Sequence, residues 1–151
     1  MGKIVAVNTS AQKGIRKEPA TECVVRANCG LDGDAHSGPE SHRQVSLLAL
    51  ESIEKMQQEG YDVRPGDFAE NLTTQDIALL SLPVGTLLTA GDGVLLEISQ
   101  VGKECHADCA IMRQVGKCVM PAEGVFAKVL AGGTVKPGDS IGVEGKSSES
   151  F

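Results

Sequence analysis

The sequence is poor in aromatic residues: it has no tryptophan, one tyrosine and three phenylalanines among 151 residues. Its core must therefore be built mainly from aliphatic side chains. The sequence also lacks any block of lysine and arginine, and its formal net charge is −6. Because nucleic acids bind to concentrated basic surfaces, this composition argues against a nucleic-acid partner. An anionic small ligand remains compatible with it, since a few cations and backbone N–H groups can hold one.

Long apolar runs are missing as well. No stretch approaches the length needed to cross a bilayer, and residues 1–10 lack the apolar core and cleavage site of a signal peptide. We therefore expect a cytoplasmic protein with no membrane partner. In that compartment cysteines are expected to be thiols, metal ligands or redox groups rather than disulfides. The sequence has five of them: Cys23, Cys29, Cys105, Cys109 and Cys118.

Short β-branched and aliphatic segments separated by glycine-rich turns dominate the chain. The predicted strands are residues 4–7, 22–27, 44–46, 69–73, 86–90, 94–99 and 134–143, the last broken by a Pro-Gly-Asp turn. Helices are predicted at residues 47–58, 105–114 and 124–130. This pattern predicts a mainly β fold, a closed or nearly closed β-barrel of short mixed strands with a few short helices, because closure removes exposed edges.

The clearest local prediction is a hairpin. Residues 86–90 and 94–99 are apolar runs joined by Gly91-Asp92-Gly93, residues that tolerate positive φ. The length of the chain is that of one domain, which we assign to residues 1–145. The Ser- and Glu-rich residues 146–151 are predicted to form a disordered tail.

A glycine-rich loop provides the first candidate site. Residues 33–38 contain Asp34 and His36, and His42 and Arg43 follow. An acid, two histidines and an arginine in one loop are suited to form the wall of a polar site. The alternative is an ordinary turn in which Asp and Ser side chains bond to their own backbone.

Glu70 and Asn71 form the second candidate, because they interrupt a segment otherwise suited to burial. A buried carboxylate is costly unless it is paired, so we predict an arginine partner for Glu70 such as Arg43. The alternative is that Glu70 is solvated and Asn71 merely ends a strand.

The third candidate is the most informative. Cys105 follows the strand at residues 94–99 and has Lys103 and His106 close in sequence. Nearby cations and a helix N-terminus both lower the pKa of a thiol and favour the nucleophilic, metal-binding thiolate. If residues 105–114 are helical, Cys109 lies one turn from Cys105 on the same face, where the two can act together.

Other interpretations of the cysteines stay open. Cys109 or Cys118 can be a small buried hydrophobe, and we place Cys23 and Cys29 in that class or assign them no role. A structural zinc site formed by Cys105, Cys109 and Cys118 with one histidine is a further alternative. The spacing lacks the paired Cys-x-x-Cys knuckles of strong zinc motifs, so zinc is less favoured.

Taken in order, four segments resemble the MOSC domain family. Residues 33–36 with 43–47 resemble its N-terminal signature, and residues 66–72 resemble its G-x-x-x-E-N-L motif. Residues 84–100 with Cys105 are similar to its cysteine segment, and residues 124–139 to its C-terminal end. MOSC domains occur at the C-terminus of molybdenum cofactor sulfurases, in amidoxime-reducing molybdoenzymes and as small stand-alone bacterial proteins. Each motif alone is weak, but four in order cover nearly the whole chain.

The resemblance implies a β-barrel-like fold and a specific role for one cysteine. The residue aligned with that cysteine is Cys105, which would carry sulfur as a persulfide or ligate molybdenum. Carried over position by position, the resemblance implies a set of residues that line or brace a cofactor pocket: Asp34, His36, Arg43, Glu70 and Asn71. Within this set, Arg43 and His36, with backbone N–H groups, would hold the phosphate of a pterin cofactor.

The chain also departs from the larger family members. It has no room for the pyridoxal-phosphate domain of the sulfurases and no lysine in a recognisable Schiff-base motif, so we expect neither pyridoxal phosphate nor cysteine desulfuration on this chain. We expect instead a sulfur carrier or molybdenum-cofactor-handling protein. Lys103 and His106 would favour the thiolate of Cys105, and Cys109 would resolve its persulfide as a disulfide. Whether it has sulfurtransferase-type activity of its own stays open.

The expected partner is a cysteine desulfurase or a molybdopterin-biosynthesis protein that donates or accepts sulfur. The oligomeric state is left open. Two alternatives accompany this hypothesis. The first is a docking or chaperone module for a molybdopterin-synthesis enzyme or molybdoenzyme, with no covalent step. The second is a zinc-stabilised scaffold, which would lose thermal stability on chelation.

Overall fold

The computed structural model describes residues 2–10, 17–34, 38–39, 43–68, 70–102 and 123–146, and the side chains of Glu18 and Lys146 are not described. Eleven strands, one α-helix and one short 3-10 helix make up this part of the chain. The strands are β1 Gly2–Thr9, β2 Glu18–Ala20, β3 Cys23–Arg26, β4 Gly30–Leu31, β5 Val45–Ala49, β6 Leu72–Gln75, β7 Thr86–Ala90, β8 Val94–Val101, β9 Val125–Ala131, β10 Gly133–Val135 and β11 Ser140–Lys146. The helices are α1 Leu50–Gln58 and η1 Leu79–Ser81.

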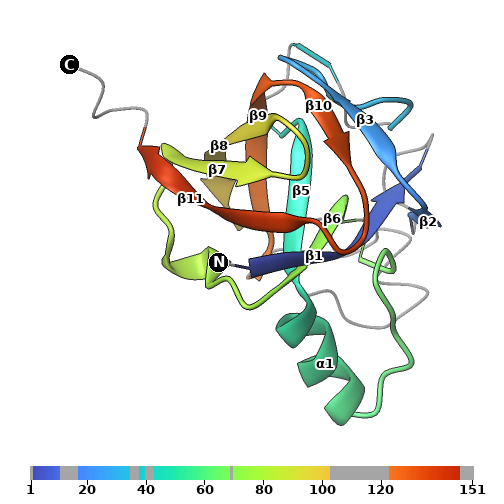
Figure 1. Ribbon diagram of the computed structural model, residues 1–151. Helices are drawn as coiled ribbons and strands as arrows, with labels where there is room; N and C mark the ends of the chain where they lie inside the picture. The colour runs from blue at the N-terminus through green and yellow to red at the C-terminus, as the bar shows by residue number, and fades with distance from the viewer. Residues whose placement is uncertain are drawn as a thin grey trace.

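A closed barrel forms the centre of the fold (Figure 1). Its strands follow the order β11-β7-β8-β9-β5-β6-β1, and β1 pairs back with β11, where Gly2 faces Ile141. β2 adds to the outside of this ring by pairing with β1. Among the described strands, β5 and β6 are parallel and the other barrel pairs are antiparallel. The predicted mainly β fold with a closed barrel is confirmed.

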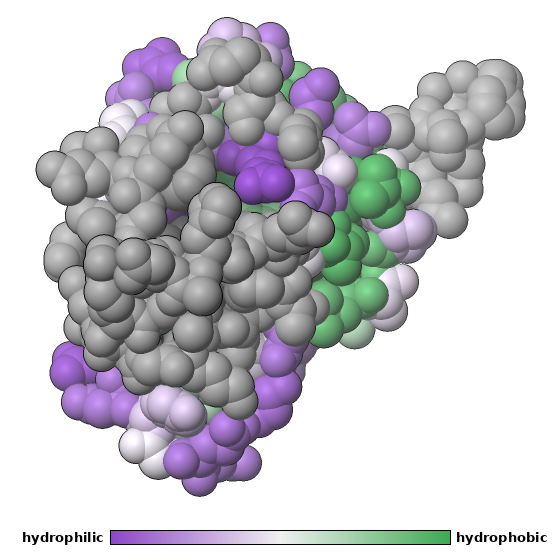
Figure 2. Space-filling model, turned by 180° about the vertical axis from the view of Figure 1, so that it is seen from behind, coloured by the Kyte–Doolittle hydropathy of each residue, from purple (hydrophilic) through white to green (hydrophobic). Residues whose placement is uncertain are grey.

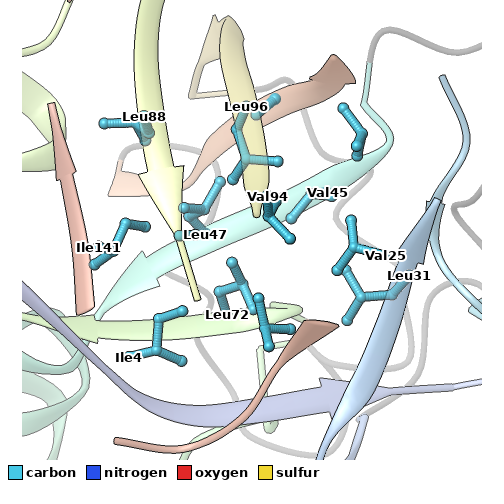
Figure 3. Packing of buried hydrophobic residues seen from close by; sticks show 14 of the residues in the cluster. Ile4, Val25, Leu31, Val45, Leu47, Leu72, Leu88, Val94, Leu96 and Ile141 are labelled. Carbon is cyan, nitrogen blue, oxygen red and sulfur yellow. The ribbon is translucent and has the colours of Figure 1, made fainter. Parts of the chain in front are cut away.

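A second, three-stranded sheet covers one side of the barrel (Figure 1). It has the order β10-β3-β4, with Gly133 opposite Val25 and Val25 opposite Leu31. Figure 3 shows the side chains of Val25 and Leu31 approaching Val45 and Val94 of the barrel strands. The small sheet therefore closes the barrel's interior on that side and shares its core.

The barrel interior is aliphatic, as the scarcity of aromatic residues predicted. Ile4, Leu47, Leu72, Leu88 and Leu96 lie on five different strands, are at most 1% exposed, and belong to one cluster (Figure 3). Burying each such side chain contributes about 1.5–3 kcal/mol relative to leaving it in water. This cluster is the main source of stability in the fold.

A smaller core lies outside the barrel, under α1. Ile53 and Met56 are one turn apart on the inner face of α1, and both are fully buried. They pack with Leu48 of β5 and with the aromatic rings of Phe68 and Phe126. Because α1 packs there, β5 is buried on both of its faces: Leu47 points into the barrel and Leu48 toward the helix.

This two-sided burial explains two wrong predictions. The helix predicted at residues 47–58 begins at Leu50, because residues 45–49 form β5. The helix predicted at residues 124–130 is a strand, β9, which pairs with both β5 and β8. A strand that is apolar on both faces has no period of two, so its pattern does not separate it from a buried helix. The helix predicted at residues 105–114 lies outside the described residues.

The predicted hairpin is confirmed. β7 and β8 pair from Ala90 and Val94 outward, and the turn between them contains Gly91 at φ +57° and Gly93 at φ +85°. β11 ends at Lys146, the first residue of the predicted tail, and residues 147–151 lie outside the described part. None of the helices described here has the length and apolarity required to cross a membrane.

Candidate functional site

Arg43 brings a cation to the end of β8, close to the segment that contains Cys105. Its Nε donates a hydrogen bond of 2.9 Å to Oε1 of Gln100, which lies near the end of β8, just before that segment begins. Its guanidinium carbon lies 5.6 Å from the centre of the Phe126 ring, within the range of a cation–π contact. Strand β8 and an aromatic ring of β9 therefore position the charge together.

Hydrogen bonds of Gly102 fix the point at which the chain leaves β8 toward Cys105. Nε2 of Gln100 donates to the carbonyl of Gly102 at 2.7 Å, and the N–H of Gly102 donates to the carbonyl of Gly124 at 2.6 Å. The chain therefore leaves β8 and returns to β9 at one defined point. Sequence reasoning found Arg43 but missed Gln100 and Phe126 as the residues that position it, since neither is near it in the chain.

Asp34 forms a buried ion pair. Its Oδ1 lies 2.8 Å from Nζ of Lys17, both side chains are 0% exposed, and the N–H of Ser10 donates to the same oxygen at 3.0 Å. A buried carboxylate needs such partners to offset the loss of hydration. Asp34 thus joins the chain that enters β2 to the loop that follows β4. Lys17 was not predicted, because a lone lysine in a polar loop carries no signal of burial.

Glu70 is buried completely, but its partners differ from the prediction. Its Oε2 accepts hydrogen bonds from the N–H of Gly66 at 3.0 Å and from the hydroxyl of Thr73 at 2.8 Å. Burial raises the pKa of Glu70 to about 7, although the hydrogen bonds from Gly66 and Thr73 act in the opposite direction. The predicted pairing with Arg43 is wrong: a backbone amide and a hydroxyl, not a guanidinium, hold this carboxylate.

One oxygen of this buried carboxylate lacks a hydrogen bond. Among the described residues, Oε1 of Glu70 and Oδ1 of Asn8 have no hydrogen-bond partner. The other end of the Asn8 amide donates to Oγ1 of Thr73 and to the carbonyl of Glu70, both at 3.2 Å. An acceptor without a donor in a buried site favours the protonated acid, which agrees with the raised pKa of Glu70.

Asn71 links three strands of the barrel. Its Oδ1 accepts from the backbone N–H of Ser46 at 2.9 Å and from its hydroxyl at 3.1 Å, and its Nδ2 donates to the carbonyl of Asn8 at 3.2 Å. Asn71 is 0% exposed. The amide therefore satisfies backbone groups of β1 and β5 at the start of β6. Of the two interpretations of the Glu70-Asn71 motif, the buried one is correct and the solvated one is wrong.

The predicted residues thus fall into three groups. Arg43 is half-buried, and the end of β8 orients its side chain. The side chains of Asp34, Glu70 and Asn71 are buried and bond to other loops and strands of the fold. The remaining predicted site residues lie outside the described part of the chain: Lys103, Cys105, His106, Cys109 and His36.

Two cysteines, Cys23 and Cys29, are described, and both are half-buried free thiols. Cys23 packs against the main core, and burial raises the pKa of its thiol, which favours the unreactive protonated form. Within the described ranges, no group of three or more His, Cys, Asp or Glu side chains is arranged to hold a metal ion.

The order of these elements and the motifs on them identify the class of protein. Residues 32–142 match the MOSC domain family, and the chain belongs to this family. The family is generally linked to functions like those of the molybdenum cofactor sulfurases. A comparison with curated proteins finds no match.

Solved structures share the fold. The YuaD protein from Bacillus subtilis has a TM-score of 0.74 at 18% identity, over 93% of this chain and 94% of that chain. YiiM from Geobacillus stearothermophilus has a TM-score of 0.71 at 21% identity, over 95% of this chain and 75% of that chain. YiiM from Escherichia coli has a TM-score of 0.63 at 22% identity, over 97% of this chain and 71% of that chain. At these identities the comparison establishes the fold alone.

Proposed function

We propose that this MOSC domain carries sulfur for, or binds, the molybdenum cofactor, with Cys105 as the reacting thiol and Arg43 as the cation that receives an anionic group. The observation that supports this most is the 2.9 Å bond between Arg43 and Gln100, which sets a positive charge at the base of the segment containing Cys105. The family match over residues 32–142 supports the choice of chemistry.

The described residues fit an anionic cofactor at this place. A guanidinium is planar, always charged and weakly hydrated, so it suits a phosphate better than an ammonium does. Phe126 and Gln100 fix the plane of Arg43, which reduces the entropy lost when a ligand binds. When bound, a molybdenum cofactor supplies a metal centre that accepts sulfur ligands, and on this chain Cys105 is the thiol assigned to it. Asp34, Glu70 and Asn71 act as bracing residues.

The sulfur-carrier step needs only a persulfide donor. The Cys105 thiolate attacks the outer sulfur of a donor persulfide, the donor's S–S bond breaks, and the donor leaves as a thiolate. Cys105 then holds the transferred sulfur as its own persulfide, with no net oxidation. In a later step Cys109 attacks the inner sulfur, which forms a Cys105–Cys109 disulfide and releases hydrosulfide. A cysteine desulfurase is the class of protein that supplies such a persulfide.

Intact-mass measurement tests the carrier step directly. The full chain is incubated with a cysteine desulfurase and cysteine, and the wild type is compared with Cys105→Ser and with the matched control Cys23→Ser. We expect the wild type and the control to gain one sulfur atom that a reductant removes, and Cys105→Ser to gain none. A wild type with neither added sulfur nor a Cys105–Cys109 disulfide, or an equal gain in Cys105→Ser, would reject Cys105 as the carrier and favour the docking alternative.

Elemental analysis tests the cofactor half of the proposal. The protein is purified from cells that make molybdenum cofactor, and the molybdenum bound per chain is measured. We expect Arg43→Gln to hold less molybdenum than the wild type, while Arg26→Gln, which removes an exposed arginine elsewhere, leaves the content unchanged. Equal molybdenum content in all three proteins would show that Arg43 does not hold the cofactor.

A further inference from the structure

An open groove of about 590 Å³ lies outside the barrel beside the start of α1. It is lined by Ala49, Glu51 and Ser52, by residues 76–81, and by Glu123. A second hollow of about 380 Å³ shares residues 76–78 and 81 with it and continues along η1 toward β11. The two together make an elongated depression that follows the connection from β6 to β7.

The chain segment along this depression exposes apolar side chains that do not belong to the core. In residues 77–84 the one polar side chain is Ser81. Leu79 belongs to the barrel core and is 2% exposed, but Leu80, which also lines the groove, is 50% exposed. Val84, three residues after the last groove-lining residue of this segment, is 61% exposed. Figure 2 shows apolar surface gathered into one patch on the face that it presents. Gathered apolar surface of this kind marks an interaction site more often than single exposed residues do.

Three acidic residues line the groove together with the apolar ones. Glu51, Asp76 and Glu123 all line the groove, and none of its described lining residues is lysine or arginine. The backbone N–H of Asp76 donates to Oε2 of Glu51 at 3.0 Å, so the two acids are held close together. Glu123 accepts from Ser52 at 2.7 Å and pairs with Lys55, which lies just outside. The described rim is therefore net negative, on a chain whose net charge is −6.

We propose that this groove binds a short segment of a partner protein in which apolar side chains are flanked by lysine or arginine. The apolar floor would receive the apolar anchors, and Glu51 and Asp76 would pair with the flanking cations. A second copy of this chain fits less well, because a symmetric contact would bring two negative rims together. The elongated shape favours an extended segment over a compact small molecule. The inference does not depend on Cys105.

Peptide display tests this proposal by letting the groove select its own ligands. A random library of short peptides is selected on the full wild-type chain and counter-selected on Leu80→Ser. We expect the enriched peptides to combine Leu, Ile, Met or Phe with Lys or Arg. Enrichment of acidic peptides, or no enrichment over the counter-selected chain, would overturn the proposal.

Binding of synthetic copies of the enriched peptides then measures the apolar and the electrostatic contributions separately. We expect Leu80→Ser to weaken binding about tenfold or more, since it removes most of one apolar contact, whereas Leu130→Ser, at an exposed leucine outside the groove, leaves it unchanged. The double variant Glu51→Gln/Asp76→Asn should weaken binding and reduce its salt dependence, and Glu54→Gln/Asp62→Asn should do neither. Equal effects of the groove and control variants would overturn the proposal. So would concentration-dependent dimerisation that Leu80→Ser abolishes.

Discussion

The ammonium of Lys17 lies 2.8 Å from a carboxylate oxygen of Asp34, and both side chains are completely buried. The pair joins two loops that are far from each other in the strand order, one before β2 and one after β4. Because both side chains are buried, water cannot replace either partner if the other is removed. The packing of these two loops therefore depends on both residues being present.

We expect Lys17→Met to lower the free energy of unfolding by roughly 3–5 kcal/mol, because it removes this cation from the buried Asp34 carboxylate. The double variant Lys17→Met/Asp34→Leu should lose less than Lys17→Met alone, because it removes both charges. Urea denaturation followed by circular dichroism measures all three proteins. The exposed pair Arg26 and Asp32, 3.0 Å apart, is the matched control, and Arg26→Met should change stability little. A loss in Lys17→Met no larger than in Arg26→Met would contradict the prediction.

The buried carboxyl of Glu70 predicts that stability depends on pH. Its pKa is raised from the ordinary value of 4.5 to about 7, so the folded chain binds a proton there more tightly than the unfolded chain. The stabilising effect of that proton is complete below about pH 4.5 and is lost as the pH rises through 7. We therefore expect Glu70 to lower the free energy of unfolding by up to about 3 kcal/mol between about pH 5 and pH 8.

Glu70→Gln should remove that pH dependence. The glutamine oxygen keeps the bonds from Gly66 and Thr73, and its NH₂ replaces the oxygen that has no donor. The variant should be more stable than the wild type at about pH 8 and similar to it at about pH 5. Thermal unfolding across this range measures the difference, with Glu54→Gln as an exposed control. Parallel pH profiles for the wild type and Glu70→Gln would show that Glu70 is not the group responsible.

Two glycines with similar positive φ angles should differ in their tolerance of alanine. Gly66 has φ +93° and Gly138 has φ +98°, so alanine is strained at both. A Cβ at Gly66 would lie 2.5 Å from the carbonyl oxygen of Lys17, whereas a Cβ at Gly138 would meet nothing within 4 Å. We expect Gly66→Ala to cost roughly 2–4 kcal/mol and Gly138→Ala about 1 kcal/mol. Chemical denaturation tests this, and equal losses would refute the close approach.

Substitution of the two adjacent leucines of η1 should distinguish a residue that supports the fold from one that supports binding. Leu79 is 2% exposed and belongs to the barrel core, whereas Leu80 is 50% exposed at the groove. Leu79→Ala should cost about 2–5 kcal/mol, and Leu80→Ala should change stability by less than about 0.5 kcal/mol. Differential scanning calorimetry distinguishes the two variants. A large loss in Leu80→Ala would mean that Leu80 supports the fold rather than a partner.

Local patterns in the sequence predicted much of the fold. The hairpin of β7 and β8 follows from two apolar runs around Gly91 and Gly93, and the aliphatic core follows from composition. β9 was mistaken for a helix because Phe126 and Val125 lie on opposite faces that are both buried. The second buried face of β9 is created by the packing of α1, which is distant from β9 in sequence. The local sequence pattern of β9 therefore does not reveal that this face is buried.

The sequence predicted which residues belong to the candidate site better than it predicted the contacts they make. The motif around Glu70 and Asn71 was recognised, but Asn8, which bonds to the Glu70 carbonyl, is 62 residues away. Pairings of this kind depend on barrel closure and are not encoded near either residue. The groove had a signal that was overlooked: residues 77–84 connect two strands, yet they are almost entirely apolar. Connections are normally polar, so such a run indicates either a buried loop or a contact surface.

The pairing of β1 with β11 sets the order in which the protein can assemble. Gly2 and Lys3 align with Ile141 and Ser140, so this pairing forms only after the strands between β1 and β11 have been synthesised. Until then β1 pairs with β6 on one edge and, through residues 7–9, with β2 on the other, so the part of that edge at Gly2 and Lys3 stays open. Such long-range closure is slow relative to local hairpins. During synthesis this short edge is available to pair with other nascent chains, and the late pairing with β11 removes it.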